Sequence, residues 1–222
     1  MESSTDRLTA LQREFLTAFF EQERGFFLTG GAALAGFYLH HRETTDLDLF
    51  TRDPKAFERG VSSLHAAADK VGATLAIKQD APGFKRYLVS RRSEGVLIDL
   101  VWERVPAAYD RTNERGGIIL DVPEEIVVNK LTTLVSRSEP RDLVDLMLLE
   151  RSGCSIEAAL PKALEKDGGC TPATLAWVLS EIRLPDGVDL PGGIAPEELR
   201  SFLSGLIVLT LRLAAPNQSE QT

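Results

Sequence analysis

Two aspartates placed two positions apart, Asp46 and Asp48, are the residues of this sequence best suited to do chemistry. The segment Asp46 to Thr51 alternates acidic and apolar residues, which predicts a β-strand with both carboxylates on one face of a sheet. Carboxylates this close repel each other unless a cation lies between them, and hard divalent ions such as Mg²⁺ or Mn²⁺ prefer oxygen ligands. The pair therefore predicts a metal site, although an isolated pair of this kind also occurs as a solvated strand end.

A third aspartate, Asp99, lies in the apolar segment Val96 to Trp102, which also predicts a strand. A buried unpaired charge is costly, so Asp99 is either a satisfied buried acid or, if the two strands are neighbours, a member of the same cluster. Three carboxylates that hold two metal ions suit in-line displacement at a nucleotide α-phosphate. One ion lowers the pKa of the attacking hydroxyl, and the other stabilises the leaving pyrophosphate.

A glycine pair supplies the second half of the expected site. The apolar run Phe26 to Leu28, then Thr29, Gly30 and Gly31, then an alanine-rich segment predicts a strand, a tight turn and a helix. Glycines let the backbone approach a phosphate closely, and N–H groups at the start of a helix favour its charge. The hydroxyl of Thr29 is a candidate for a further contact.

Strand patterns lie in the first half of the chain and helical patterns in the second, which predicts an α+β fold. We expect a catalytic domain over residues 1–122, with a mixed sheet and helices, and a helical domain over residues 123–215. The last residues, 216–222, are expected to be a disordered tail.

The composition narrows the class of protein. The 222 residues carry a formal net charge of −8, which argues against a broad surface that coats nucleic acid non-specifically. The N-terminal sequence lacks the apolar region of a signal peptide, and no apolar stretch is long enough to cross a bilayer, so a cytoplasmic location is expected. Cys154 and Cys170 are expected to be reduced, buried thiols, without zinc-ligand spacing to the histidines.

The glycine pair, the two-aspartate strand and the third aspartate together resemble the polymerase-beta-like nucleotidyltransferases. A closer resemblance is to the AbiEii/AbiGii toxin family of that superfamily, and it spans about Phe27 to Leu149. Its first motif is matched by Gly30, Gly31, Leu34, His41, Arg42, Asp46, Leu47, Asp48, Leu49 and Phe50. Its later lysine and RDxxDL motif are matched by Lys130, Arg141, Asp142, Asp145 and Leu146.

The resemblance implies a metal-dependent enzyme that transfers a nucleoside monophosphate from a nucleoside triphosphate to an acceptor hydroxyl. It implies that Asp46 and Asp48 bind Mg²⁺ or Mn²⁺, that Asp99 is a third ligand or the base, that Lys130 contacts the triphosphate and that Asp142 supports the site. It also implies a toxin with a cognate antitoxin, with the tRNA 3′ end as one candidate acceptor. Many members of the superfamily have serine where this chain has Gly31, so a hydroxyl contact to phosphate is absent.

Other interpretations of these residues remain open. Lys130 has the alternative of a surface lysine that extends along its helix, and Arg141 with Asp145 has the spacing of an intrahelical ion pair. His41 and Arg42 are interpreted as structural groups near a helix end. Strands predicted over Thr74 to Lys78, Phe84 to Ser90 and Val96 to Trp102, with turn signals between them, indicate a meander. The basic group around this meander is either solvated surface or a contact to a tRNA backbone; it comprises Lys78, Lys85, Arg86, Arg91 and Arg92.

Two alternatives to transfer onto tRNA also follow from the sequence. One is a nucleotidyltransferase whose acceptor is a protein hydroxyl or a small molecule such as an aminoglycoside. The other is a nucleotide-binding regulatory module without turnover, against which the intact set of three aspartates argues.

Overall fold

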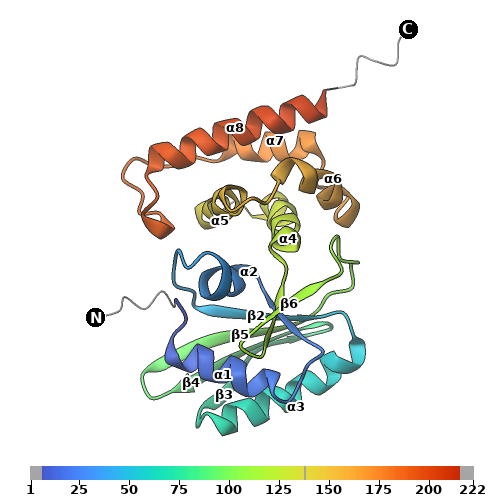
Figure 1. Cartoon of the computed structure of the whole chain (residues 1–222), viewed down its shortest axis with the longest axis vertical. Helices are drawn as coiled ribbons and strands as arrows, with labels where there is room; N and C mark the ends of the chain where they lie inside the picture. Colours follow the sequence, from blue (N-terminus) through green and yellow to red (C-terminus); the bar gives the residue numbers. More distant parts are fainter. Residues whose placement is uncertain (1–6, 138, 216–222) are drawn as a thin grey trace. The chain divides into compact units, whose positions relative to one another are not determined.

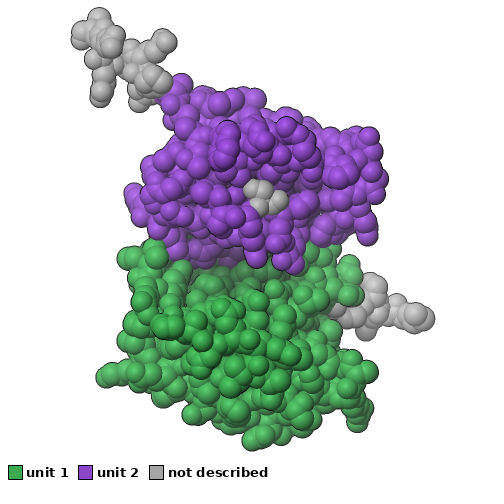
Figure 2. All heavy atoms as spheres, turned by 180° about the vertical axis from the view of Figure 1, so that it is seen from behind, with its two compact units in different colours: residues 1–122 green, residues 123–222 purple. Residues whose placement is uncertain are grey.

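The chain divides into two compact units, residues 1–122 and residues 123–222 (Figure 2). The computed structural model describes residues 7–137 and 139–215. The tail expected over residues 216–222 lies outside the described residues.

The first unit is built on a seven-stranded mixed sheet with the strand order β3-β4-β5-β2-β1-β7-β6. β2 runs antiparallel to β1 and parallel to β5, while β4 pairs antiparallel with both β3 and β5. The strands are β1 (Phe27–Thr29), β2 (Asp46–Thr51), β3 (Thr74–Ala81), β4 (Phe84–Arg91), β5 (Glu94–Trp102), β6 (Thr112–Arg115) and β7 (Ile118–Asp121).

One face of this sheet forms the core of the unit. The pairing register brings four leucines side by side on it, and all four are fully buried: Leu28, Leu49, Leu100 and Leu120. The helices α1 (Ala10–Phe20) and α3 (Pro54–Lys70) cover this face, on the lower side of the sheet in Figure 1. Gly60 of α3 allows a close approach, because a Cβ there would lie 2.7 Å from the ring of Phe26.

The opposite face carries the short helix α2 (Gly30–Ala33), which continues directly into a π-helical turn, η1 (Leu34–Tyr38). The hydroxyl of Tyr38 donates a hydrogen bond to the carbonyl oxygen of Asp121 (2.8 Å), which fixes the end of η1 to β7. His40 then adopts a left-handed backbone conformation (φ 51°), which reverses the chain towards β2. The sequence predicts a helix after the glycine pair, but the structure has only four α-helical residues there, followed by a π-helical turn.

The second unit is helical. It comprises α4 (Pro123–Ser136), α5 (Pro140–Arg151), α6 (Ile156–Lys166), α7 (Pro172–Glu181), a 3₁₀ turn η2 (Pro191–Gly193) and α8 (Pro196–Ala214). Prolines at the first position begin α4, α5, α7 and α8, as their fixed φ favours. Within the described residues, no helix has both the length and the apolar character that a membrane span requires. Both Cys154 and Cys170 are free thiols, and burial raises the pKa of Cys170 to about 12.

The mixed sheet followed by helices confirms the α+β prediction. β6 is the strand that the sequence does not predict. All four of its residues are exposed, so it lacks the apolar alternation by which a strand is recognised.

Candidate active site

The face of the sheet opposite the core carries a row of polar side chains across five neighbouring strands. Thr29 pairs with Asp48, Asp48 with Asp99, and Asp99 with Arg86. The row continues to β7, where the hydroxyl of Thr29 donates a hydrogen bond to Asp121 (2.8 Å). Each residue of this polar row is a chain neighbour of a core residue, so strand alternation directs it away from the core.

The position of Asp46, at the start of β2, is fixed through α1. The side-chain amide of Gln12 donates to the carbonyl oxygen of Thr44 (2.7 Å), and the Thr44 hydroxyl donates to a carboxylate oxygen of Asp46 (2.9 Å). Gln12 is itself part of the capping box that begins α1 with Thr9. The end of a helix on the core side therefore orients a carboxylate on the opposite face.

Gly30 lies directly against Asp48. A Cβ built on Gly30 would lie 2.5 Å from the Oδ2 atom of Asp48, and its φ of 62° is also one that other residues rarely adopt. The turn predicted at Gly30 and Gly31, called the glycine corner below, thus lies beside Asp48 of the predicted aspartate pair. Thr29, predicted as a phosphate contact, is buried and directs its hydroxyl proton to Asp121 instead of to open space.

Arg86 holds Asp99 in a two-point ion pair. Its Nε and Nη2 atoms donate to the two carboxylate oxygens at 2.7 and 2.6 Å. The pKa of Arg86 is raised, first by these hydrogen bonds and further by attraction to Asp99, Asp46 and Asp48, against the lowering effect of desolvation. Both aspartates of β2 therefore lie within electrostatic reach of this guanidinium.

The fit of a divalent cation can be judged from these donors. Among residues 7–137 and 139–215, no three His, Cys, Asp or Glu side chains are arranged as a ready metal cage. Asp46 and Asp48 fit a divalent cation by chemistry and by their common face, whereas Asp99 already binds Arg86. Three carboxylates and one guanidinium leave two negative charges, which match one divalent ion.

The sequence analysis places Arg86 in a basic surface group, whereas the structure places it in the site, bound to Asp99. The signal that identifies its role is the short turn at Arg92 and Ser93, where Arg91 pairs with Glu94. Counting outward from that turn brings Arg86 opposite Asp99. Elsewhere in the basic group, Lys85 pairs with Asp80 and Arg91 with Glu14.

Lys130 and the two aspartates of the RDxxD motif form a buried cluster inside the helical unit. The Nζ atom of Lys130 lies 2.6 Å from Asp142 and 2.7 Å from Asp145, and each side chain is less than a tenth exposed. Lys130 is therefore not the surface lysine of the alternative interpretation. Arg141 pairs with Glu139 (2.5 Å), and the suggested partner Asp145 binds Lys130 instead. The nucleotide contacts expected of Lys130 and Asp142 stay predictions.

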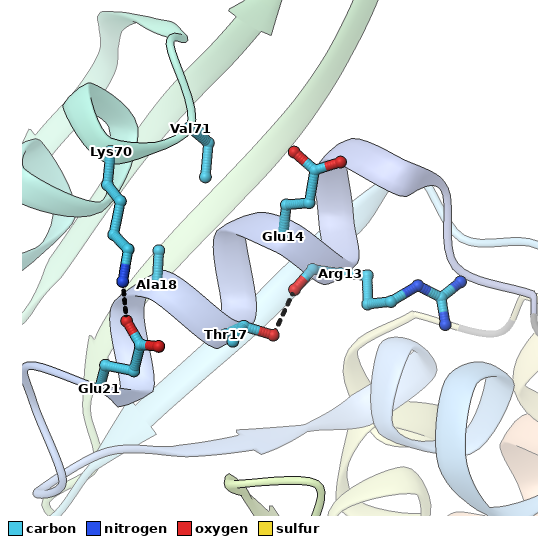
Figure 3. A pocket seen from close by; sticks show the side chains of 7 residues that line it. All are labelled: Arg13, Glu14, Thr17, Ala18, Glu21, Lys70 and Val71. Atoms are coloured by element: carbon cyan, nitrogen blue, oxygen red, sulfur yellow. Dashed lines mark hydrogen bonds and ion pairs between the residues drawn. The ribbon is translucent and has the colours of Figure 1, made fainter.

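A cavity of about 320 Å³ lies away from the polar row, against α1 and the end of α3. It is lined by Arg13, Glu14, Thr17, Ala18, Glu21, Lys70 and Val71 (Figure 3). Figure 3 shows Lys70 directed at Glu21, with which it forms an ion pair. Because α1 and α3 cover the core face of the sheet, this cavity is separate from the carboxylates of Asp46 and Asp48.

Comparison with known proteins places the chain in a family. Residues 14–212 match the model of the nucleotidyl transferase AbiEii toxin family, described as a type IV toxin–antitoxin system. The chain belongs to the AbiEii family. The family is one of nucleotidyltransferase toxins, and a type IV system implies an antitoxin partner. A search of curated proteins gave no significant match.

Two solved structures from Helicobacter pylori share the fold. One, described as a candidate nucleotidyltransferase, is 20% identical with a TM-score of 0.55, and the alignment covers 92% of this chain and 93% of that one. The other, JHP933, is 19% identical with a TM-score of 0.57 and coverage of 92% and 90%. These similarities show a shared fold, which is consistent with the polymerase-beta-like core expected from the sequence.

Gly30→Ala is expected to weaken Mn²⁺ binding, because the new methyl group meets the carboxylate of Asp48. Gly72→Ala is the matched control, since Gly72 has a similar φ of 65° but no atom within 4 Å of the added Cβ. Both changes should cost about 1–2 kcal/mol of stability through backbone strain. Equal Mn²⁺ affinity of the two variants in a calorimetric titration would contradict the prediction that Asp48 binds the metal.

Lys130→Met is expected to lower the free energy of unfolding by about 3–5 kcal/mol, because it removes the buried cation from Asp142 and Asp145 and leaves Asp142 with the more distant, half-exposed Arg137 (3.6 Å). The control is Arg212→Met, which removes one partner of an exposed ion pair with Glu157 and should cost less than about 1 kcal/mol. Urea denaturation measures both. A small effect of Lys130→Met would show that water or rearrangement satisfies the two aspartates.

Proposed function

We propose that this chain is a metal-dependent enzyme that transfers a nucleoside monophosphate from a nucleoside triphosphate to an acceptor hydroxyl. The observation that carries the proposal is the pairing of Asp48 with Asp99 on neighbouring strands, beside the glycine corner at Gly30. The AbiEii family membership supports the reaction class. We take tRNA as the first acceptor to test, with a protein hydroxyl and a small molecule as the alternatives.

In this proposal Asp46 and Asp48 hold Mg²⁺ or Mn²⁺. When bound, the divalent cation neutralises their repulsion and supplies Lewis-acid activation of the α-phosphate. Thr44 and Gln12 keep Asp46 in position, and Gly30 leaves room for the carboxylate of Asp48. The acceptor oxygen forms a bond to the α-phosphorus, the bond from that phosphorus to the bridging oxygen breaks, and pyrophosphate leaves.

Asp99 keeps the two roles expected of it, a third ligand or the base that takes the hydroxyl proton. Arg86 uses one lone pair on each oxygen of Asp99, and a carboxylate oxygen can accept a second bond. Either role is therefore compatible with an intact ion pair. Arg86 also supplies a positive charge beside Asp46 and Asp48, which lowers the cost of gathering three acids.

The transfer reaction is tested with each of the four nucleoside triphosphates, labelled on the α-phosphate, in Mg²⁺. The acceptors are total tRNA, cell protein and an aminoglycoside. We expect label on tRNA with the wild type, and a loss of at least about 100-fold with Asp48→Asn, because a neutral amide is a poor metal ligand. Asp110→Asn, at a side chain that is 90% exposed, is the control and should keep full activity.

The outcomes of this experiment separate the candidate functions. Label on protein or on the aminoglycoside would replace tRNA as the acceptor while the reaction class stands. Nucleotide binding without transfer to any acceptor would favour the regulatory module. Growth arrest on expression, abolished by Asp48→Asn, connects the chemistry to toxicity.

Arg86→Met is expected to make the stability of the chain depend more strongly on metal. Without its guanidinium, Asp99 is a nearly buried carboxylate that lacks its partner, so the melting temperature in EDTA should fall. Added Mn²⁺ should then raise the melting temperature more than in the wild type, since a ligand that binds the folded state stabilises it. Arg86→Lys, which retains the charge, is the control. An Mn²⁺ shift equal to that of the wild type would contradict the placement of the metal beside Asp99.

A further inference from the structure

Gly31, the second glycine of the pair, makes room for the side chain of Arg42. A Cβ built on Gly31 would lie 2.5 Å from Nη2, 3.3 Å from Cζ and 3.4 Å from Nη1 of Arg42. Three atoms of the guanidinium therefore lie against the bare Cα of Gly31. The φ angle of Gly31 is outside the left-handed range, so its backbone conformation does not require glycine. The requirement is for space.

The segment between the two residues folds back to bring them together. After the π-helical turn η1, the left-handed His40 reverses the chain, and the Nε of Arg7 donates to the carbonyl oxygen of His40 (2.9 Å). Arg42 then donates from Nη1 to the carbonyl oxygen of Glu43 (3.2 Å). These contacts hold the segment that carries Arg42 beside Gly30 and Gly31.

The two neighbouring glycines thus border groups of opposite charge. Gly30 lies against the carboxylate of Asp48, and Gly31 lies against the guanidinium of Arg42. A metal ligand and a cation at adjacent backbone positions are what a metal-bound polyphosphate needs, because its oxygens face both. The helix that begins with these glycines, α2, has four residues, so a full positive charge is a much stronger source of attraction here than the backbone.

We propose that Arg42 binds the triphosphate of the nucleotide, in the space that a serine side chain at position 31 would otherwise occupy. The proposal rests on the function proposed above and assigns it a phosphate-binding residue. Arginine suits this task because its planar fork of N–H groups matches two phosphate oxygens at once. The absence of a serine hydroxyl at Gly31 is then coupled to a stronger phosphate contact from Arg42.

The test is a calorimetric titration of the full chain with inorganic tripolyphosphate and with a non-hydrolysable nucleoside triphosphate, both in Mn²⁺. Arg42→Met should weaken binding of both probes at least about 10-fold, and Arg42→Lys should weaken it less, since the lysine keeps the charge but loses the fork. Gly31→Ala should weaken binding to a similar extent, because the new methyl group displaces the guanidinium.

The double variant Gly31→Ala with Arg42→Met decides whether the two residues act together. If the glycine serves the arginine, the double variant binds tripolyphosphate no more weakly than Arg42→Met alone. Additive losses would overturn this coupling. Arg24→Met is the matched control: it removes a half-exposed arginine of the same unit, paired with Glu114, and should leave binding unchanged.

Two further readouts separate this inference from the proposed function. Mn²⁺ affinity and the melting temperature should be unchanged in Arg42→Met and Arg42→Lys; a fall in melting temperature with unchanged tripolyphosphate affinity would assign Arg42 a structural role and overturn the inference. Tripolyphosphate binding that needs Asp48 but not Arg42 would overturn it while the proposed function stands. If tripolyphosphate binding needs Arg42 but no acceptor is labelled, the inference stands and the proposed enzymatic function is refuted.

Discussion

The alternation of side chains along β2 and β5 is the constraint on which the candidate site depends. In each strand an apolar residue turned to the core has an acidic neighbour turned away from it, so burying Leu49 and Leu100 places Asp48 and Asp99 together on the opposite face. A shift of the register by one residue would place carboxylates in the core and leucines on the opposite face. The free energy that fixes the hydrophobic core thereby also fixes the site.

Gathering acids on one face requires nearby positive charge, and Arg86 supplies it. Its guanidinium binds Asp99 from the adjacent strand and attracts Asp46 and Asp48. In the helical unit the negative charges of Asp142 and Asp145 are compensated by a buried lysine, Lys130, which lies between them. There the lysine ammonium binds both aspartates, so these two residues of the RDxxD motif have a structural role within their own unit.

Much of the first unit can be predicted from local sequence, because the determining signals are local. The bounds of β2 follow from the alternation of Asp46 to Thr51, and the start of α3 follows from Pro54. β6 and the π-helical turn escape prediction, since four exposed residues carry no periodicity and a π turn has no compositional marker. The role of Arg86 depends on pairing register, and that of Arg42 on a chain reversal at a non-glycine residue, His40. The position of Arg86 opposite Asp99 can be counted from the turn at Arg92 and Ser93, whereas no compositional marker indicates the reversal at His40.

The polar row is complete only after the whole first unit has been synthesised. Its members are translated in an order that differs from their order in space, and the last of them, Asp121, closes the first unit. A nascent chain that ends after β2 has both aspartates of that strand but neither Asp99 nor Arg86. Premature termination or cleavage within the sheet therefore yields fragments without a complete row, and the proposed transfer reaction would be absent from them.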